Sequence, residues 1–271
     1  MKFNFPFKKY DINSFLINLV KECILLANSI KNNFIKYKED GSPITQLDLE
    51  LDKLIYNALA SQKLGIPIVS EERKHSDEIY KNTAYWLVDP LDGTRGFING
   101  NSEYTINIAL IYEDEPVLGV IGHPPSNKIW IANNSNLLIL ENNKIIYNNS
   151  INLNIKETKT IITSRHVSKK LSEFINYFDK YKVIKTSSSL KFCVLAEGQA
   201  ALYPRLEKIS KWDIAAGHAI VNAAGGRLYD FNKNKISYKS ETKKTSPFFA
   251  LSNTQYEDEV FLNYKNYLLN S

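Results

Sequence analysis

Residues 89–94, DPLDGT, place two carboxylates beside a proline and a glycine at the end of an apolar run. Proline fixes the second position of a tight turn, and glycine accepts the conformation that follows it. Asp89 and Asp92 should therefore leave this turn on the same side. Taken alone, Asp89 could simply cap the turn, and Asp92 could be a solvated charge.

More carboxylates follow or open other predicted elements. Glu71 and Glu72 follow the β-like run 66–69 after a single serine, Ser70, and Asp213 opens a helix of small residues. Each of them could be an ordinary cap or a surface charge. Their occurrence together with DPLDGT instead indicates a metal site, because Mg²⁺ takes oxygen ligands and completes its shell with water or substrate phosphate.

Such a ligand set predicts phosphate-ester chemistry. Two ions about 4 Å apart can share one carboxylate, one ion activating water and the other stabilising the leaving oxygen. Asp89 is the natural candidate for the shared ligand. The sequence contains no Cys/His cluster for zinc, no G-x-x-x-x-G-K-[ST] phosphate loop and no G-x-S-x-G elbow. Thiolate, nucleotide-triphosphatase and serine-hydrolase chemistries therefore lack their signatures.

The N-terminal elements that would position these residues can be predicted from periodicity. Residues 12–34 carry apolar side chains at three- and four-residue spacing, which predicts a helix with one buried face. Thr45 can cap a second helix, with Asp48 in its first turn. Predicted strands lie at 66–69, 85–88, on both sides of a turn at 113–116, near 129 and at 137–140. We expect two helices to cover one face of this sheet.

From Thr160 onward, strands and helices alternate, which favours a second α/β layer. The predicted strands lie at 160–163, 183–185, 200–203, near 228 and near 249, and the helices at about 168–178, 189–197 and 213–223. The polar stretch 142–156 is the predicted boundary. We therefore expect an N-terminal α+β half at 1–155, which carries Glu71 and DPLDGT, and a C-terminal α/β half at 156–271.

The composition indicates a folded protein for small anionic substrates. With 271 residues, of which 44% are hydrophobic, the chain can bury a large core. Its net charge of +5 comes from scattered residues rather than from a polybasic tail. Cys23 and Cys193 lie among apolar neighbours, so we expect buried thiols in a reducing compartment rather than a disulfide.

Charges and a proline interrupt the first 15 residues, where a secretory signal needs an unbroken apolar stretch. No apolar run elsewhere in the sequence is long enough to span a membrane. We expect a cytoplasmic protein. Peripheral attachment to the inner membrane surface stays open, as does the choice between a monomer and a homodimer.

The carboxylate pattern resembles the Mg²⁺-dependent, lithium-sensitive phosphatases related to inositol monophosphatase. That family has a helical aspartate, a Glu-Glu pair, DPLDGT, and Trp-Asp followed after eleven residues by Gly-Gly. Here the pattern reads Asp48, Glu71-Glu72, 89–94, Trp212-Asp213 and Gly225-Gly226. The resemblance extends over nearly the whole chain. It implies a five-layered αβαβα sandwich with the site between the two α/β halves.

The same resemblance implies a Mg²⁺ site with two ions. Glu71, Asp89 and the backbone carbonyl of Leu91 would bind one ion, while Asp89, Asp92 and Asp213 would bind another. A third, weaker ion near Glu71 stays open. Lithium inhibition is likewise expected from the resemblance alone.

The implied catalytic residues are Asp48 and Thr94, which would orient and deprotonate the attacking water, with help from Glu71. Gly93 and Thr94 would offer backbone N–H and hydroxyl groups to the scissile phosphate. The residues expected to contact substrate are Leu91, Asp92, Gly93, Thr94, His166, Ser188, Lys191, Arg205 and Asp213.

Within the family, the chain is most similar to the 3'(2'),5'-bisphosphate nucleotidases, through the segments SSLKFC (188–193), AEGQA (196–200) and LYPR (202–205). This similarity implies hydrolysis of the 3'-phosphate of adenosine 3',5'-bisphosphate to AMP and phosphate. The related 3'-phosphate 5'-phosphosulfate stays open as a second substrate.

Three side chains in or near these segments have a physical reason to bind the substrate's phosphates. Ser188 precedes a predicted helix, whose free N–H groups favour a phosphate, and Lys191 adds positive charge there. The guanidinium of Arg205 could hold a second phosphate in bidentate fashion, and an ordinary surface ion pair is the less favoured alternative. His166 matches a histidine that contacts the non-scissile side of the substrate in related enzymes.

Two classes of alternative remain. The chain could act on inositol monophosphate or fructose 1,6-bisphosphate and share only the metal chemistry. It could also bind anions or nucleic acid without catalysis. The second class is disfavoured, because the basic residues are not grouped with aromatic stacking platforms, and converging carboxylates repel a phosphate backbone unless metals neutralise them. We expect a small-molecule substrate and no nucleic-acid partner.

Overall fold

The computed structural model describes residues 11–30, 34–148, 158–239 and 242–270 of the 271-residue chain. In these ranges, the first sheet has seven strands in the order β3-β4-β5-β6-β7-β8-β9. They are β3 (Ile68–Ser70), β4 (Ala84–Asp92), β5 (Thr105–Tyr112), β6 (Glu115–His123), β7 (Lys128–Asn133), β8 (Asn136–Glu141) and β9 (Lys144–Asn148). Neighbouring strands are antiparallel except β3 and β4, which run parallel.

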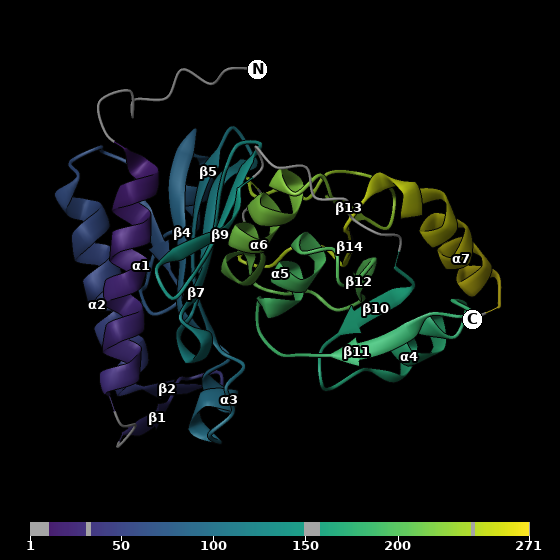
Figure 1. Ribbon diagram of the computed structural model, residues 1–271, viewed down its shortest axis with the longest axis horizontal. Helices are drawn as coiled ribbons and strands as arrows, with labels where there is room; N and C mark the ends of the chain where they lie inside the picture. Colours follow the sequence, from purple (N-terminus) through teal and green to yellow (C-terminus); the bar gives the residue numbers. More distant parts are fainter. Residues whose placement is uncertain (1–10, 31–33, 149–157, 240–241, 271) are drawn as a thin grey trace.

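Two helices, α1 (Ile12–Ser29) and α2 (Gln46–Ser61), cover one face of this sheet (Figure 1). Leu16 and Leu47 of the helices pack in one buried cluster with Ile108 and Val120 of the sheet. As predicted, Thr45 caps α2 and forms a capping box with Asp48. These contacts confirm the predicted helical cover of the first sheet.

The predicted extension of the first helix to residue 34 is wrong, because α1 ends at Ser29. Ile30 is extended, and Phe34 lies outside the helix and is 38% exposed. From Ile35 the chain forms β1 (Ile35–Tyr37), which pairs antiparallel with β2 (Pro43–Thr45). Apolar residues keep helical spacing beyond Ser29, so the sequence pattern does not mark the end of the helix. The chain must nevertheless leave the helix before residue 35, because Ile35–Tyr37 pairs with β2.

The other face of the first sheet packs on α5 (Leu190–Ala196) and α6 (Lys211–Ala223) (Figure 1). A second, five-stranded sheet lies beyond them in the order β11-β10-β12-β14-β13. Its strands are β10 (Thr160–Thr163), β11 (Lys182–Lys185), β12 (Leu202–Arg205), β13 (Arg227–Asp230) and β14 (Phe248–Leu251). Because α6 lies between two sheets, it is buried on almost every side, which explains its small residues.

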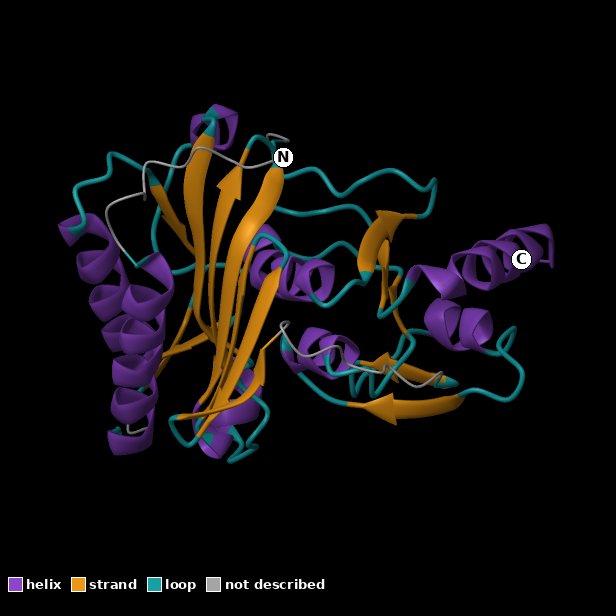
Figure 2. Ribbon diagram, turned by 45° about the horizontal axis from the view of Figure 1, so that its top comes forward, coloured by secondary structure: helices purple, strands orange, loops and turns teal. Residues whose placement is uncertain are grey.

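The outer face of the second sheet is covered by α4 (Lys169–Ile175) and α7 (Glu257–Asn270), whose side chains form a third core (Figures 1 and 2). The layers are thus α1 and α2, the first sheet, α5 and α6, the second sheet, and α4 and α7. This order confirms the predicted five-layered αβαβα sandwich.

Several elements were not predicted, among them β1, β2, the short helix at Thr94–Ile98, α7 and β9. The sequence interpretation ended its helices at 213–223 and so omitted α7, although Val260, Tyr264 and Tyr267 have helical spacing. It also assigned residues 144–148 to the polar boundary stretch 142–156, whereas these residues form β9 and extend the first sheet. Residues 149–157 lie outside the described ranges, and the division into halves near residue 155 stays a prediction.

The remaining predicted elements are present with shifts of a few residues at their ends. The short helix α3 (Thr94–Ile98) and three 3₁₀ turns, at Asp77–Lys81, Pro124–Ser126 and Thr254–Tyr256, complete the described elements. Cys23 and Cys193 are free and buried, as predicted. Among the described helices, none is both long and apolar enough to cross a membrane.

Candidate active site

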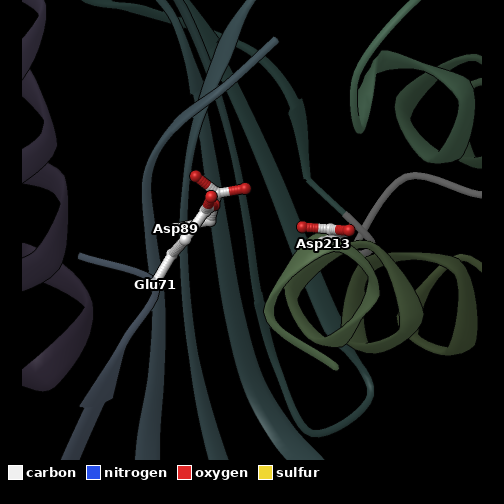
Figure 3. Close-up of side chains that lie close together, drawn as sticks. All are labelled: Glu71, Asp89 and Asp213. Atoms are coloured by element: carbon white, nitrogen blue, oxygen red, sulfur yellow. The ribbon is translucent and has the colours of Figure 1, made fainter. Parts of the chain in front are cut away.

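Three carboxylates from distant parts of the chain converge between the first sheet and α6. Glu71, Asp89 and Asp213 each offer an oxygen, and these atoms lie within 4.8 Å of one another. Figure 3 shows Glu71 and Asp89 extending from the sheet toward Asp213 on α6. The fold brings these three segments, which are far apart in the sequence, to one point.

The sheet register explains why Glu71 and Asp89 are neighbours. Ser70 pairs with Val88 in the parallel β3–β4 ladder, and the Glu71 amide donates to the Val88 carbonyl at 3.1 Å. The next residue of each strand is therefore an acid at the same edge of the sheet. Strand-end carboxylates were predicted here from sequence.

The DPLDGT segment forms an irregular strand end rather than the predicted turn after residue 88. Strand β4 continues to Asp92, with its register shifted between Asp89 and Asp92, and Asp89 accepts from the Leu91 amide at 3.1 Å. Gly93 follows with φ of +97°, and a Cβ there would lie 2.8 Å from the Glu103 carbonyl oxygen. Only glycine fits this position, because both the left-handed conformation and the close backbone exclude a side chain.

A cavity of about 370 Å³ opens at the three acids. The predicted residues Leu91, Asp92, Gly93 and Thr94 also line it, together with residues of the β1–β2 hairpin. The structure therefore brings together every predicted metal ligand. We call this space the acidic cavity.

Asp48 lies behind Thr94 and is almost fully buried. The Thr94 hydroxyl has two acceptors at 2.9 Å, Asp48 Oδ1 and the Leu91 carbonyl. Asp48 Oδ2 accepts from the amide of Thr45 at 2.8 Å and from its hydroxyl. Burial raises the pKa of Asp48 despite these hydrogen bonds.

The acids of this site repel one another. Burial raises the pKa of Asp89 well above its usual value, and the charges of Glu71, Asp92 and Asp213 raise it further. Burial also raises the pKa of Asp213 well above its usual value, and the charges of Asp92 and Glu71 raise it further. Buried carboxylates of this kind require a cation or protons. Because all the donors are oxygens, the set fits a hard divalent ion such as Mg²⁺.

Lys38 is a charged partner that sequence reasoning missed. Its Nζ lies 2.9 Å from Glu71 Oε1 and 2.8 Å from Glu72 Oε1. Burial alone would lower the pKa of Lys38, but the two carboxylates raise it overall. Burial also raises the pKa of Glu72 to about 7. A single lysine beside the turn at 39–42 has no spacing pattern that would have identified it.

A second cavity of about 170 Å³ adjoins the acidic cavity, since Asp92 and Asp213 line both. The predicted residues Ser188, Lys191 and Arg205 line it, and so does Tyr203. We call it the basic cavity. Tyr203 Oη and Arg205 Nε are buried and have no hydrogen-bond partner within the described chain.

Ser188 is held by the first sheet. Its φ is +60°, its hydroxyl donates to Asp92 Oδ2 at 2.8 Å, and the Ser189 amide donates to the same oxygen at 2.7 Å. The Lys191 ammonium donates to the Ser188 carbonyl and lies 5.3 Å from the ring centre of Tyr203. A phosphate contact of Ser188 stays a prediction, because its hydroxyl is engaged by Asp92 here.

Among the described residues that line the two cavities, His166 does not occur. It lies exposed in the loop after β10, two residues beyond Ser164, which does line the basic cavity. The other histidines have hydrogen-bond partners within the protein; His218 Nδ1, for example, lies 2.9 Å from the hydroxyl of Tyr238. A substrate contact of His166 stays a prediction.

Comparison with known proteins identifies the family. The family model "Inositol monophosphatase family" matches residues 10–260. The 3'(2'),5'-bisphosphate nucleotidase CysQ of Buchnera aphidicola is 39% identical over 234 residues, which are 84% of this chain and 88% of that protein. The protein of the same name from Escherichia coli K12 is 36% identical over 216 residues, or 79% and 87% of the two chains. The crystal structure of CysQ from Bacteroides thetaiotaomicron aligns with a TM-score of 0.75 and 27% identity, over 89% of this chain and 98% of that one. This chain belongs to the inositol monophosphatase family.

Proposed function

We propose that this protein is a Mg²⁺-dependent 3'(2'),5'-bisphosphate nucleotidase that converts adenosine 3',5'-bisphosphate to AMP and phosphate. The observation that carries the proposal is the pair of adjoining cavities, one acidic and one basic, which share Asp92 and Asp213. This arrangement suits a substrate with one phosphate at a metal site and a second anionic group nearby. The names of the relatives from Buchnera aphidicola and Escherichia coli support the same activity.

The proposed ligands for one ion are Glu71, Asp89 and the Leu91 carbonyl, and for another Asp89, Asp92 and Asp213. A third ion near Glu71 remains part of the proposal. When bound, such ions lower the pKa of water and stabilise negative charge on a leaving oxygen. The Lys38 ammonium neutralises part of the charge of Glu71 and Glu72.

Thr94 and Asp48 are placed to move a proton. Because the Thr94 hydroxyl donates to Asp48 Oδ1 at 2.9 Å, Thr94 Oγ1 can accept a proton from the attacking water while its own proton passes to Asp48. The raised pKa of Asp48 favours its role as the final acceptor. The amides of Gly93 and Thr94 would bind the scissile phosphate at the beginning of α3.

The non-scissile phosphate would bind in the basic cavity. The buried Arg205 Nε, without a partner within the described chain, is a donor that a phosphate oxygen would satisfy. Lys191 would add a second positive charge, and Ser188 and His166 are proposed as further contacts. An inositol monophosphate has no second phosphate for these cations, which favours the nucleotide.

The phosphosulfate remains a candidate second substrate. We also propose a cytoplasmic location. Peripheral attachment to the inner membrane surface stays open, as does the choice between a monomer and a homodimer. We propose no nucleic-acid partner, because the basic residues of the sequence are not grouped with aromatic stacking platforms.

Substrate comparison tests the proposed function. Phosphate release should be measured from adenosine 3',5'-bisphosphate, inositol 1-phosphate and fructose 1,6-bisphosphate, each with Mg²⁺ and with excess chelator. We expect the highest kcat/KM for the nucleotide and no release under chelation. A higher kcat/KM for inositol 1-phosphate or for fructose 1,6-bisphosphate than for the nucleotide would refute the nucleotidase assignment.

A further inference from the structure

Glu103 connects the sheet that carries the acids to two loops of the second sheet. Its carboxylate accepts from Arg165 Nη2 at 2.6 Å and from Arg165 Nε at 2.7 Å. The same carboxylate accepts from the Ser187 amide at 3.0 Å. Arg165 lies in the loop after β10, and Ser187 lies in the loop after β11.

Each partner of Glu103 is the sequence neighbour of a residue in the wall of the basic cavity. Ser164, which lines the cavity, precedes Arg165, and Ser188, which also lines it, follows Ser187. The two loops leave the same edge of the second sheet, because Thr163 and Lys185 are register partners in parallel strands. One carboxylate therefore holds two walls of the same cavity.

We propose that Glu103 is a positioning residue that fixes the walls of the basic cavity relative to the acidic cavity, and thereby sets the affinity for the non-scissile part of the substrate. This inference rests on the proposed function.

The backbone near Glu103 gives this link a rigid base. The Glu103 carbonyl packs so close to Gly93 that a Cβ at Gly93 would lie 2.8 Å from it. Gly93 belongs to the DPLDGT segment, so the loop that carries Glu103 is packed directly against the acidic cavity. A shift of the Glu103 backbone would therefore disturb both cavities.

Ser188 needs such support because its backbone is left-handed, which is unfavourable for a residue with a side chain. Two carboxylates hold this turn, one from Asp92 at the end of β4 and one from Glu103 in the loop before β5. Asp92 accepts from the Ser188 hydroxyl, and Glu103 accepts from the amide of the preceding residue. Without the Glu103 contact, this turn would keep its links to Asp92 and to Thr105 and Asn107 of the first sheet, all of which act on Ser188 or Ser189 rather than on Ser187.

Electrostatics favour a role in binding over a role in stability. Burial would raise the pKa of Glu103, but its hydrogen bonds from Arg165 and Ser187 lower it to about 2, so the carboxylate is charged at working pH. The side chain of Arg165 is 52% exposed. Ion pairs with such an exposed partner add little to the free energy of unfolding. Removal of the pair should therefore change the position of the loops more than the stability of the fold.

Kinetics of Glu103 variants provide the first test. Glu103→Ala removes both links, Glu103→Gln removes the charge, and Arg165→Met removes one partner. We expect Glu103→Ala to raise the KM for adenosine 3',5'-bisphosphate about five- to tenfold, with kcat within about twofold of wild type. The inhibition constant of inorganic phosphate, which needs only the acidic cavity, should stay unchanged. Adding Arg165→Met to Glu103→Ala should raise KM no further.

Glu78→Gln is the matched control, because Glu78 forms a surface ion pair with Lys81 at 2.9 Å in a 3₁₀ turn remote in sequence from both loops. It should leave all the constants unchanged. An equal rise in KM and in the phosphate inhibition constant for Glu103→Ala would overturn the inference, because Glu103 would then act on the acidic cavity.

Amide hydrogen exchange provides a readout that does not depend on activity. In folded Glu103→Ala the Ser187 amide loses its acceptor, so exchange across 186–189 should be faster, while exchange in α6 stays as in wild type. Unchanged exchange together with an unchanged KM would refute the positioning role. If wild-type protein failed to hydrolyse the bisphosphate, the proposed function would be wrong, and hydrogen exchange alone would then decide whether Glu103 fixes the loops.

Discussion

At the scale of single residues, the site is dominated by acids that the fold forces together. Asp89 is 1% exposed and experiences the charges of Glu71, Asp92 and Asp213. Such an arrangement costs free energy in the metal-free protein, because a buried carboxylate loses its hydration. The cost is consistent with a function that requires a multivalent cation at this point.

Asp89→Asn tests the shared ligand. The substitution keeps the shape of the side chain but removes the charge that would serve both ions. We expect kcat to fall by about 10²–10³-fold or more, as when a preorganised electrostatic group is removed from other active sites. Phosphate release in a steady-state assay measures this effect. Activity within a few-fold of wild type would contradict the bridging role.

Lys191→Met and Arg205→Met test the basic cavity. Each change removes a charge-assisted hydrogen bond to the proposed second phosphate, worth about 1.5–3 kcal/mol, or roughly 10- to 150-fold in kcat/KM. The loss should appear mainly in KM. If both variants kept the wild-type KM for the bisphosphate, the second phosphate would have to bind elsewhere.

The sequence identified those residues whose spacing is tied to a recognisable segment. Glu71, Asp89 and Asp213 stand next to strand or helix signals, and the structure brings them within 4.8 Å. Lys38 and Glu103 could not be found in this way. Each lies in a connecting segment without a recognisable motif, and the importance of Lys38 and Glu103 depends on partners 33 and 62 residues away.

At the scale of elements, α6 positions Asp213 by packing very closely on the first sheet. A Cβ at Gly119 of β6 would lie 2.5 Å from the Ala216 carbonyl oxygen and 2.8 Å from the Ala219 Cβ. Small residues on both elements therefore permit this close approach. The distance between α6 and the sheet in turn sets how near Asp213 lies to Asp89.

Gly119→Ala tests this packing. The extra methyl group must push α6 from the sheet, so we expect a loss of about 1–3 kcal/mol in the free energy of unfolding. Mg²⁺ affinity, measured by calorimetry on folded protein, should also fall because Asp213 moves away. Gly96→Ala is a suitable control for stability, since its nearest contact would be an ordinary 3.6 Å. Unchanged Mg²⁺ affinity in Gly119→Ala would contradict the link between packing and the site.

The elements were predicted where one face is apolar and one is polar, as in α2, or where the apolar run is unbroken, as in β5. Prediction failed where tertiary contacts decide the outcome. Strand β9 is exposed along most of its length and gains its structure by pairing with β8. The end of α1 is likewise set by the β1–β2 pairing rather than by its own residues.

At the scale of the whole molecule, the two sheets and the helices between them supply different parts of the site. The first sheet provides Glu71 and Asp89, and α6 provides Asp213. The metal-free molecule therefore carries a set of like charges at the junction of its layers. Its stability should depend on pH and on Mg²⁺.

The pH dependence of the free energy of unfolding can be predicted from Glu72, whose pKa is raised from 4.5 to about 7 by burial. Between these values the folded state binds more protons than the unfolded state, so the free energy of unfolding falls as pH rises through this window. The raised pKa values of Asp89 and Asp213 act in the same direction. The acids of the site should therefore contribute less stability at pH 8 than at pH 5 in the metal-free protein, while the lowered pKa values of His75, His123 and His218 act in the opposite direction below about pH 6.5.

Mg²⁺ should reverse this loss, because it binds deprotonated carboxylates. At about 100 times its Kd, we expect Mg²⁺ to raise Tm by about 5–10 °C at pH 8 and by less at pH 5. Thermal unfolding followed by circular dichroism at both pH values measures the difference. An equal Tm gain at both pH values would argue against binding at these acids.

Anomalous diffraction from crystals soaked in Mn²⁺ and phosphate tests the central claim most directly, because Mn²⁺ takes the same oxygen ligands as Mg²⁺. The account predicts anomalous density among the carboxylates of Glu71, Asp89 and Asp213, at about 2.0–2.2 Å from their oxygens. Carboxylates that turn away from one another, with no anomalous density between them, would contradict it.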